Sequence, residues 1–268
     1  MDVNIVMFDF FTQTILPSFH DMKPYGVYKK TWGETVFESR HNEDPGVQNM
    51  DYRLNNYGHR SDDFVKTHEG LHVLFAGCSF TFGESLPYKQ NWSGKLYEKI
   101  KDIAPLDNYF ALAFMNGITS NIVYNILLYC KEFGKPEIIF CLFPDAVRKV
   151  DFVNDGFVID YRFDKYHSEL GRLDCLKSIT FLEEYCEALG IKLFWSTWSG
   201  NDTKVYSKLK FKNFVFLEDV DVFMNAKNKH ESGDPFYKIG RDGDHPGLQY
   251  SDGVANIFFD NFKKNYDG

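Results

Sequence analysis

Residues Leu71–Pro87 read LHVLFAGCSFTFGESLP, and this stretch decides the fold. Its apolar run, LHVLFA, is continuous rather than alternating, as is typical of a strand buried on both faces of a parallel sheet. The run stops at Gly77, and Cys78 and Ser79 then stand before a second turn glycine, Gly83. One glycine is enough to end a strand, so the serine and the thiol at this point call for another explanation.

Apolar runs and helix-like stretches alternate from this point onward. The expected strands are 71–76, 108–114, 137–143, 191–198 and 213–217, and the expected helices are 88–104, 116–134, 168–190 and 248–266. The first helix has apolar residues every three or four positions, which places them on one face. They are Trp92, Leu96, Ile100 and Ile103. This alternation predicts a three-layer α/β/α fold with a central parallel sheet, of the flavodoxin-like kind.

The chain divides into two parts. Residues 1–70 hold many turn formers, as in HNEDPGVQNMD, and are predicted to form an irregular N-terminal extension. Residues 71–268 are predicted to form the α/β domain. A chain of 268 residues with 44% apolar content can bury a substantial core in one such domain.

The charge balance argues against a nucleic-acid partner. The chain has 30 Lys and Arg against 38 Asp and Glu, a formal net charge of -8, and no dense basic block. Phosphate backbones attract clustered cations, so we expect no nucleic-acid partner. The oligomeric state has no signature in the sequence.

The N-terminus and the cysteines indicate a cytoplasmic protein. The first residues, MDVNIVMFDFF, lack a basic n-region and a small-residue cleavage site, so no signal peptide is expected. No apolar run reaches the roughly 18 residues needed to span a bilayer. The five cysteines are odd in number and mostly lie in apolar segments, which favours buried thiols over a disulfide framework.

Ser79 follows the C-terminal end of the first strong strand. A serine there is close to free backbone N–H groups, which suits both a nucleophile and an oxyanion pocket. A hydroxyl is a weak nucleophile without a base, so the sequence should also hold a histidine that a carboxylate orients.

Such a pair occurs in RDGDHPG, residues 241–247. Asp242 and His245 are separated by two residues in a glycine-containing turn, so the carboxylate can accept from Nδ1–H of the imidazole. Nε2 is then left to take the proton of Ser79. The turn precedes the last expected helix, which can bring the far end of the chain back to the sheet.

Each assignment has a simpler alternative. Ser79 could merely cap the turn that follows it, and His245 could be a surface histidine. Cys78 is an alternative nucleophile, because a thiol at a helix N-terminus can have a lowered pKa. Neighbouring residues at a strand end point to opposite sides, so Cys78 and Ser79 should not share one pocket.

These blocks together resemble the SGNH (GDSL-like) hydrolase superfamily. The matching elements are GCSFTFG, the glycine of AFMNGITSN after the second strand, and the late D-x-x-H. An N-x-x-G-x-R formed by Asn55, Gly58 and Arg60 also resembles a lead-in found in some microbial and phage members. The resemblance covers residues 52 to 264.

The resemblance implies a role for each matching position. Ser79 is the nucleophile, and its own N–H is the first oxyanion donor. Gly117 supplies the second donor. Asp242 and His245 complete the catalytic triad, with no cofactor and no metal.

Two positions depart from the family pattern. Cys78 stands where the family has Asp, and Pro144 of FPDAV stands where it has an oxyanion Asn. A missing donor costs about 3–4 kcal/mol of barrier. The candidates for a replacement donor are Asn116 first, then Asn121 and Arg148.

The sequence therefore predicts a serine esterase that works through an acyl-enzyme. The resemblance implies an O-acylated carbohydrate or a small ester as substrate, with Trp198 as a minor candidate for the pocket wall. Two alternatives stay open: an O-acyltransferase that resolves the same intermediate with an acceptor hydroxyl, and an inactive carbohydrate-binding module. No histidine or cysteine spacing suits zinc, and no phosphate-binding glycine loop follows a strand.

Overall fold

A computed structural model gives the fold. It describes residues 55, 57, 59–84, 86–113, 117–146, 169–217 and 245–266 with their side chains, and the backbone of 35–37, 50–52, 149–153, 156–160 and 165–168. Four residues named above lie outside the described residues: Gly58, Asn116, Arg148 and Asp242.

The centre of the domain is a parallel four-stranded sheet in the order β4-β3-β5-β8. Its strands are β3 (Val73–Gly77), β4 (Phe110–Ala113), β5 (Ile138–Phe143) and β8 (Lys192–Thr197). This order confirms the predicted flavodoxin-like arrangement. The expected fifth strand, 213–217, is reduced to one parallel bridge between Trp195 and Phe214.

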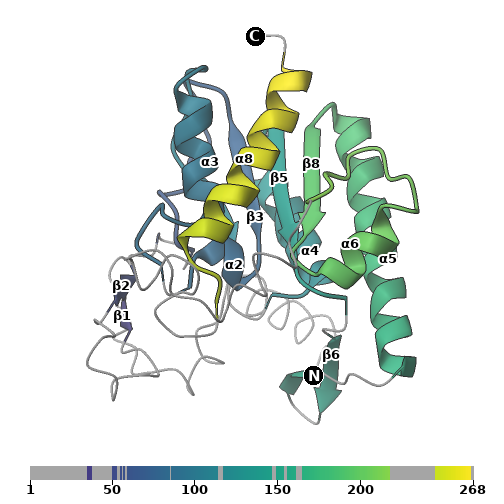
Figure 1. Cartoon of the computed structure of the whole chain (residues 1–268). Helices are drawn as coiled ribbons and strands as arrows, with labels where there is room; N and C mark the ends of the chain where they lie inside the picture. The colour runs from purple at the N-terminus through teal and green to yellow at the C-terminus, as the bar shows by residue number, and fades with distance from the viewer. Residues whose placement is uncertain are drawn as a thin grey trace.

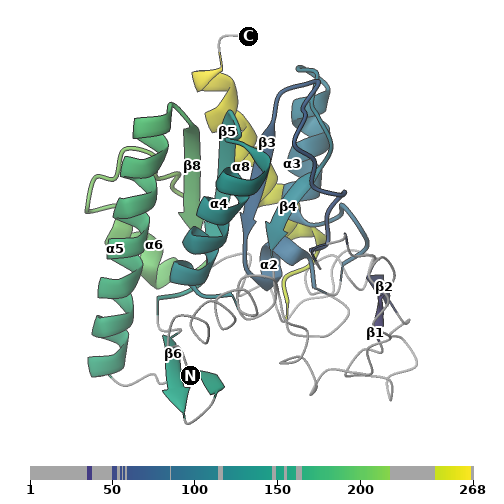
Figure 2. The same cartoon turned by 180° about the vertical axis from the view of Figure 1, so that it is seen from behind.

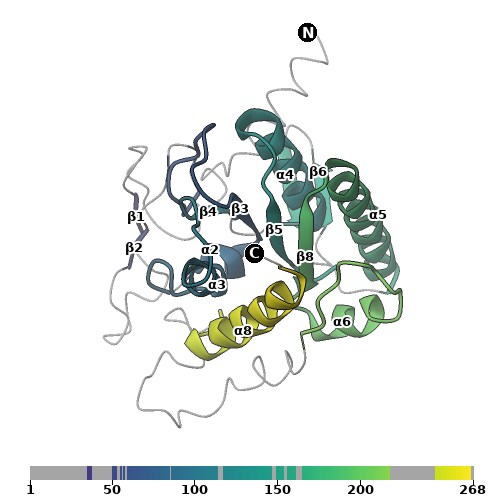
Figure 3. The same cartoon turned by 90° about the horizontal axis from the view of Figure 1, so that it is seen from above.

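Helices cover both faces of the sheet, which confirms the three layers (Figures 1 and 2). One face carries α3 (Trp92–Lys101) and α8 (Leu248–Asn265). The other carries α4 (Thr119–Phe133) and α5 (Lys165–Leu189). The view from above separates the two helical layers with the sheet between them (Figure 3).

Aromatic stacking across strands holds the α8 face of the sheet. Phe75, Phe140 and Phe194 occupy matching positions on three neighbouring strands. Their ring centroids lie 5.7 and 5.1 Å apart in stacked pairs. Phe258 of α8 meets Phe140 edge-on at 5.7 Å. Burial of such large rings is the main source of stability here and fixes α8 against the sheet.

The opposite face is built partly from thiols. The buried stripe of α5 consists of Cys175, Ile179, Leu182 and Cys186, each less than 5% exposed. All five cysteines are buried and free, as the sequence indicated. Burial raises the pKa of Cys175 to about 12, so this thiol is un-ionised and packs as a small apolar side chain.

One residue departs from its expected face. Ile103, predicted with the buried side of the first helix, is 52% exposed. The helix ends at Lys101, so Ile103 no longer follows helical spacing.

Shorter elements complete the fold. The segment that begins at Ser79 forms a single helical turn, α2 (Ser79–Phe82), and α6 (Gly200–Tyr206) follows β8. Two antiparallel pairs lie outside the sheet: β1 (Thr35–Phe37) with β2 (Met50–Tyr52), and β6 (Lys149–Val153) with β7 (Gly156–Asp160). None of the helices in the described ranges is both long enough and apolar enough to cross a membrane.

Two buried histidines predict a loss of stability in acid. Burial lowers the pKa of His59 and of His72 to about 4, so between about pH 6.5 and pH 4 both stay neutral in the folded protein while the unfolded chain takes up protons. Stability is therefore constant above about pH 6.5 and falls towards pH 4. Each histidine should cost about 2 kcal/mol at pH 5.

Urea unfolding at pH 7 and pH 5 measures this loss. His72→Gln keeps a polar partner for the hydroxyl of Tyr129, which lies 2.8 Å from Nε2 of His72. The variant should lose less stability between the two pH values than the wild type. An identical loss in both proteins would contradict the assignment to His72.

Candidate active site

The candidate site lies where the path of the chain through the sheet reverses. From β3 the chain crosses one face through α3 to β4, and from β4 it crosses the other face through α4 to β5. Such a switch point opens a crevice at the carboxyl ends of the strands. Gly77 pairs with Ala113 of β4 and with Leu142 of β5, so the loops that follow all three strands start side by side.

Ser79 stands at this switch point. It is the first residue of α2, and Cys78, not Ser79, occupies the N-cap position. The capping alternative therefore does not describe this serine. The first amides of a helix have no partner within it, and the N–H of Ser79 donates to no backbone carbonyl in the described part of the chain.

The turn at Gly77 requires the absence of a side chain. A Cβ atom at Gly77 would lie 2.1 Å from Oγ1 of Thr81 and 2.6 Å from the carbonyl oxygen of Leu142. Thr81 is itself held, since Nε1 of Trp92 donates to its Oγ1 at 3.1 Å. Only glycine lets β3 run this close to β5 and still turn directly into α2.

Cys78 and Ser79 are both buried but lie in different surroundings, since Ser79, which is 4% exposed, belongs to neither apolar cluster. Cys78 is 0% exposed and belongs to the apolar cluster on the α4 side of the sheet. Ser79 remains the nucleophile candidate.

His245 comes from the far end of the chain to the same edge of the sheet. It lies just before α8, whose first turn is next to α2 in Figure 1. Its ring meets the ring of Phe80 edge-on at 5.6 Å, and its Nε2 lies 3.3 Å from Oε2 of Glu84. The imidazole thus contacts side chains one and five residues beyond Ser79.

The expected contact between the two groups is not made in this arrangement. No hydrogen bond joins Oγ of Ser79 to His245, both of which are described residues, and the histidine nitrogen faces Glu84 instead. Asp242 and Asn116 lie outside the described residues, so their roles stay predictions. Gly117 is buried and lies two residues before α4, and its role as an oxyanion donor stays a prediction.

Hydrogen bonds fix the loop after β5 and use the carbonyl of Pro144 and the N–H of Ala146. The carbonyl of Pro144 accepts from Oγ1 of Thr197 at 3.3 Å. The N–H of Ala146 donates to Oδ2 of Asp202 at 2.8 Å, and Nε of Arg172 donates to the other oxygen of that carboxylate at 3.2 Å. Neither Pro144 nor Ala146 therefore has a backbone N–H to offer an oxyanion.

An aromatic wall borders the serine turn. Phe80 stacks on Trp198 at 4.8 Å and meets Tyr250 edge-on at 5.6 Å, in addition to its contact with His245. Trp198 follows directly after β8 at the same sheet edge. An apolar surface of this kind suits the acyl or ring portion of an ester.

Sequence reasoning missed two residues of this region. Glu84 carries no recognisable signal, because its contact with His245 joins residues that are distant in the sequence. Asp202 is 2% exposed and belongs to no motif. Asp202 lies in the first turn of α6, and the side chain of Ser199, the N-cap of that helix, accepts from its N–H at 3.4 Å. This helix start is the local sequence feature that could have drawn attention to Asp202.

Within the described residues, no group of three or more His, Cys, Asp or Glu side chains could hold a metal ion.

Comparison with known proteins gives structural likeness only. The sequence matches no family model and no curated protein. A solved structure described as an acylhydrolase from Bacteroides fragilis has 14% identity and a TM-score of 0.45, over 75% of this chain and 90% of that one. The structure of TesA has 12% identity and a TM-score of 0.48, over 72% and 99%.

A third structure is the esterase EstA from Pseudoalteromonas sp. It has 13% identity and a TM-score of 0.45, over 73% of this chain and 98% of that one. Identities this low leave the activity to be argued from the chain's own site.

The contact between Glu84 and His245 predicts a small effect of Glu84→Ala. The two side chains are 19% and 17% exposed, and partly exposed ion pairs contribute at most about 1 kcal/mol. Removing the carboxylate takes away this contact of Nε2, so fluorophosphonate labelling of Ser79 should change by no more than about fivefold. Glu98→Ala, on the exposed side of α3, is the control. A fall of more than 100-fold in Glu84→Ala would instead place Glu84 in the catalytic machinery.

Proposed function

We propose that this protein is a serine esterase of the SGNH type. The observation that carries the proposal is the position of His245, which a helix at the end of the chain brings into contact with Phe80 and Glu84, on either side of the turn that follows Ser79. A fold that used the serine only for structure would have no need to place an imidazole there.

The proposed reaction begins with attack of Oγ of Ser79 on the ester carbonyl. Nε2 of His245 takes the serine proton as the C–O bond forms and then gives it to the leaving alcohol. Asp242 orients the imidazole through Nδ1–H. The N–H groups of Ser79 and Gly117 stabilise the oxyanion, and water then hydrolyses the acyl-enzyme by the same route in reverse.

His245 must leave Glu84 to act. Rotation of the imidazole away from the carboxylate would turn Nε2 towards Ser79, whose hydroxyl lies in the same turn. Catalytic hydrogen bonds are often long or misaligned in ligand-free enzymes and tighten when substrate binds. The contact is weak enough for substrate binding to break it, because both side chains are partly exposed.

The substrate is proposed to be an O-acylated carbohydrate or another small ester. The aromatic wall of Phe80 and Trp198 supports this, since stacked aromatic faces accept the apolar face of a sugar or an acyl group. An O-acyltransferase would use the same acyl-enzyme with a sugar hydroxyl in place of water. Product analysis with and without a sugar acceptor separates these two outcomes.

Hydrolysis of p-nitrophenyl acetate, butyrate and octanoate tests the triad. Ser79→Ala and His245→Ala should each lower kcat at least about 1000-fold, because the members of a triad act as one unit. Ser207→Ala, an exposed serine after α6, should match the wild type. Equal background rates in all four proteins would refute the triad and favour an inactive binding module.

The oxyanion donor that replaces the missing family Asn gives a separate prediction. If Asn116 supplies it, Asn116→Ala should lower kcat about 100- to 1000-fold with little change in KM, since the bond forms in the transition state. Asn121→Ala is the matched comparison, because Asn121 carries the same side-chain amide within the first turn of α4. The reverse pattern would assign the donor to Asn121.

A further inference from the structure

The lead-in motif found in the sequence has no role in the reaction described above, yet it contacts both loops that start at the switch point. We call the bracket the set formed by Asn55 and Arg60 of this motif together with the neighbouring residues His59, Ser61 and Asp62. They lie against β4, which is the end strand of the sheet. An end strand presents unpaired N–H and C=O groups on its outer side.

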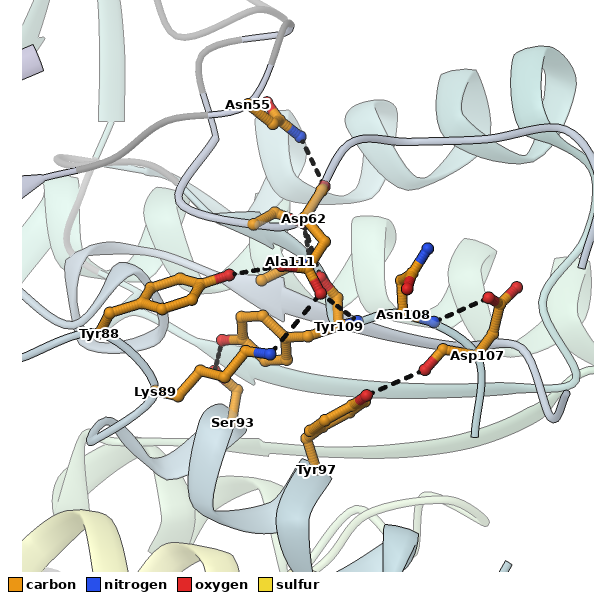
Figure 4. Close-up of polar contacts among 11 residues, drawn as sticks. Asn55, Asp62, Tyr88, Lys89, Ser93, Tyr97, Asp107, Asn108, Tyr109 and Ala111 are labelled. Atoms are coloured by element: carbon orange, nitrogen blue, oxygen red, sulfur yellow. Dashed lines mark hydrogen bonds and ion pairs between the residues drawn. The ribbon is translucent and has the colours of Figure 1, made fainter. Parts of the chain in front are cut away.

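The bracket satisfies the outer groups of β4 in succession. Oγ of Ser61 donates to the carbonyl of Tyr109 and accepts from the N–H of Ala111, both at 2.9 Å. Oδ2 of Asp62 accepts from the N–H of Tyr109 at 2.9 Å (Figure 4). Nδ1 of His59 lies 3.2 Å from the carbonyl oxygen of Ala113. That carbonyl belongs to the last residue of β4, four positions before Gly117.

Arg60 reaches the other loop. Its guanidinium donates to the carbonyl of Gly83 at 2.6 Å and to the carbonyl of Leu86 at 2.8 Å. Gly83 is the C-cap of α2, and its N–H is bonded to the carbonyl of Ser79 at 2.9 Å. Arg60 is only 4% exposed, and charge-assisted bonds in such surroundings are strong. The guanidinium therefore fixes the turn that carries the serine.

The bracket is itself held rigid. Oδ1 of Asn55 accepts from the N–H groups of Tyr57 and His59 at 3.0 and 2.9 Å. Nδ2 of Asn55 donates to the carbonyl of Asp62 at 3.2 Å, as Figure 4 shows. The hydroxyl of Tyr88 donates to the Asp62 carboxylate at 3.0 Å.

We propose that His59 and Arg60 are positioning residues that hold the two loops bearing the oxyanion donors in register with each other. Arg60 acts through α2 on the N–H of Ser79, and His59 acts through the end of β4 on Gly117. The inference rests on the proposed esterase function. The two residues are adjacent in the sequence, so any shift of one loop relative to the other must stretch bonds to the same rigid segment.

The connection of the two loops through His59 and Arg60 matters because the oxyanion donors must be placed accurately. An oxyanion hole works only when both donors lie within hydrogen-bond distance of one developing charge. A displacement of about 1 Å in the site can cost about 100-fold in rate. His59 is 1% exposed, and its burial lowers its pKa to about 4, so it is a neutral imidazole able to donate from Nδ1 to the carbonyl of Ala113.

Paired variants at each position test the proposal. His59→Asn keeps a donor near the place of Nδ1, and His59→Leu removes it. We expect His59→Leu to lower kcat on p-nitrophenyl butyrate 10- to 100-fold with KM within twofold, and His59→Asn to recover most of the rate. Arg60→Lys keeps the charge but not the two-pronged geometry, so it should fall between the wild type and Arg60→Met.

Hydrogen–deuterium exchange separates positioning from simple loss of stability. In variants that remain folded by circular dichroism, His59→Leu should speed exchange in 79–86 as well as in 113–120, because the bracket couples the two loops. Lys99→Ala, on the far side of α3, should change neither segment.

The outcomes are distinguishable. A wild type with no Ser79-dependent hydrolysis would overturn the proposed function and the positioning role with it. An active wild type whose folded His59→Leu and Arg60→Met variants keep their kcat, or show exchange changes confined to one loop, would overturn the inference alone. A 10- to 100-fold loss in kcat with rescue by His59→Asn supports it.

Discussion

The close approach of β3 to β5 at Gly77 is the constraint on which the rest of the site depends. A side chain there would collide with the backbone of β5 and with Thr81, and α2 could not start directly at the end of the strand. Because α2 starts there, the first free amides of a helix and the hydroxyl of Ser79 meet at the same point as the loops after β4 and β5. The sharp turn at Gly77 therefore brings a hydroxyl and free backbone amides together at the end of β3.

The second half of the site depends on apolar packing rather than on local sequence. His245 reaches α2 because α8 is fixed against the sheet by Phe258 and against α3 by the contact of that ring with Trp92 at 5.2 Å. Burial of such rings contributes several kcal/mol, far more than the contact of His245 with Glu84. The packing of α8 consequently sets the position of the His245 ring, while weaker polar contacts such as that with Glu84 set its orientation. The position of the imidazole therefore depends on the packing of α8 and not on its polar contact with Glu84.

The sequence predicts those features that have a local pattern. Continuous apolar runs revealed four strands, and the resemblance of GCSFTFG and D-x-x-H to a known family located Ser79 and His245. The expected fifth strand, NFVFL, has the same apolar pattern as the others, but it pairs with β8 only through the bridge between Phe214 and Trp195. Glu84 and Asp202 act through contacts across 161 and 56 positions, and no local pattern reports such contacts.

The bracket shows how one segment can meet a structural need and a functional one together. The outer groups of β4 must be paired, since an open strand edge invites association with other chains. A further strand would pair these groups equally well, but it would not by itself contact the turn that carries Ser79. Here the side chains of Ser61 and Asp62 share the pairing with the backbone N–H of Asp62, which donates to the carbonyl of Tyr109 at 3.0 Å. The neighbouring Arg60 extends the same segment to the carbonyl of Gly83, so one short stretch closes the sheet edge and contacts the serine turn.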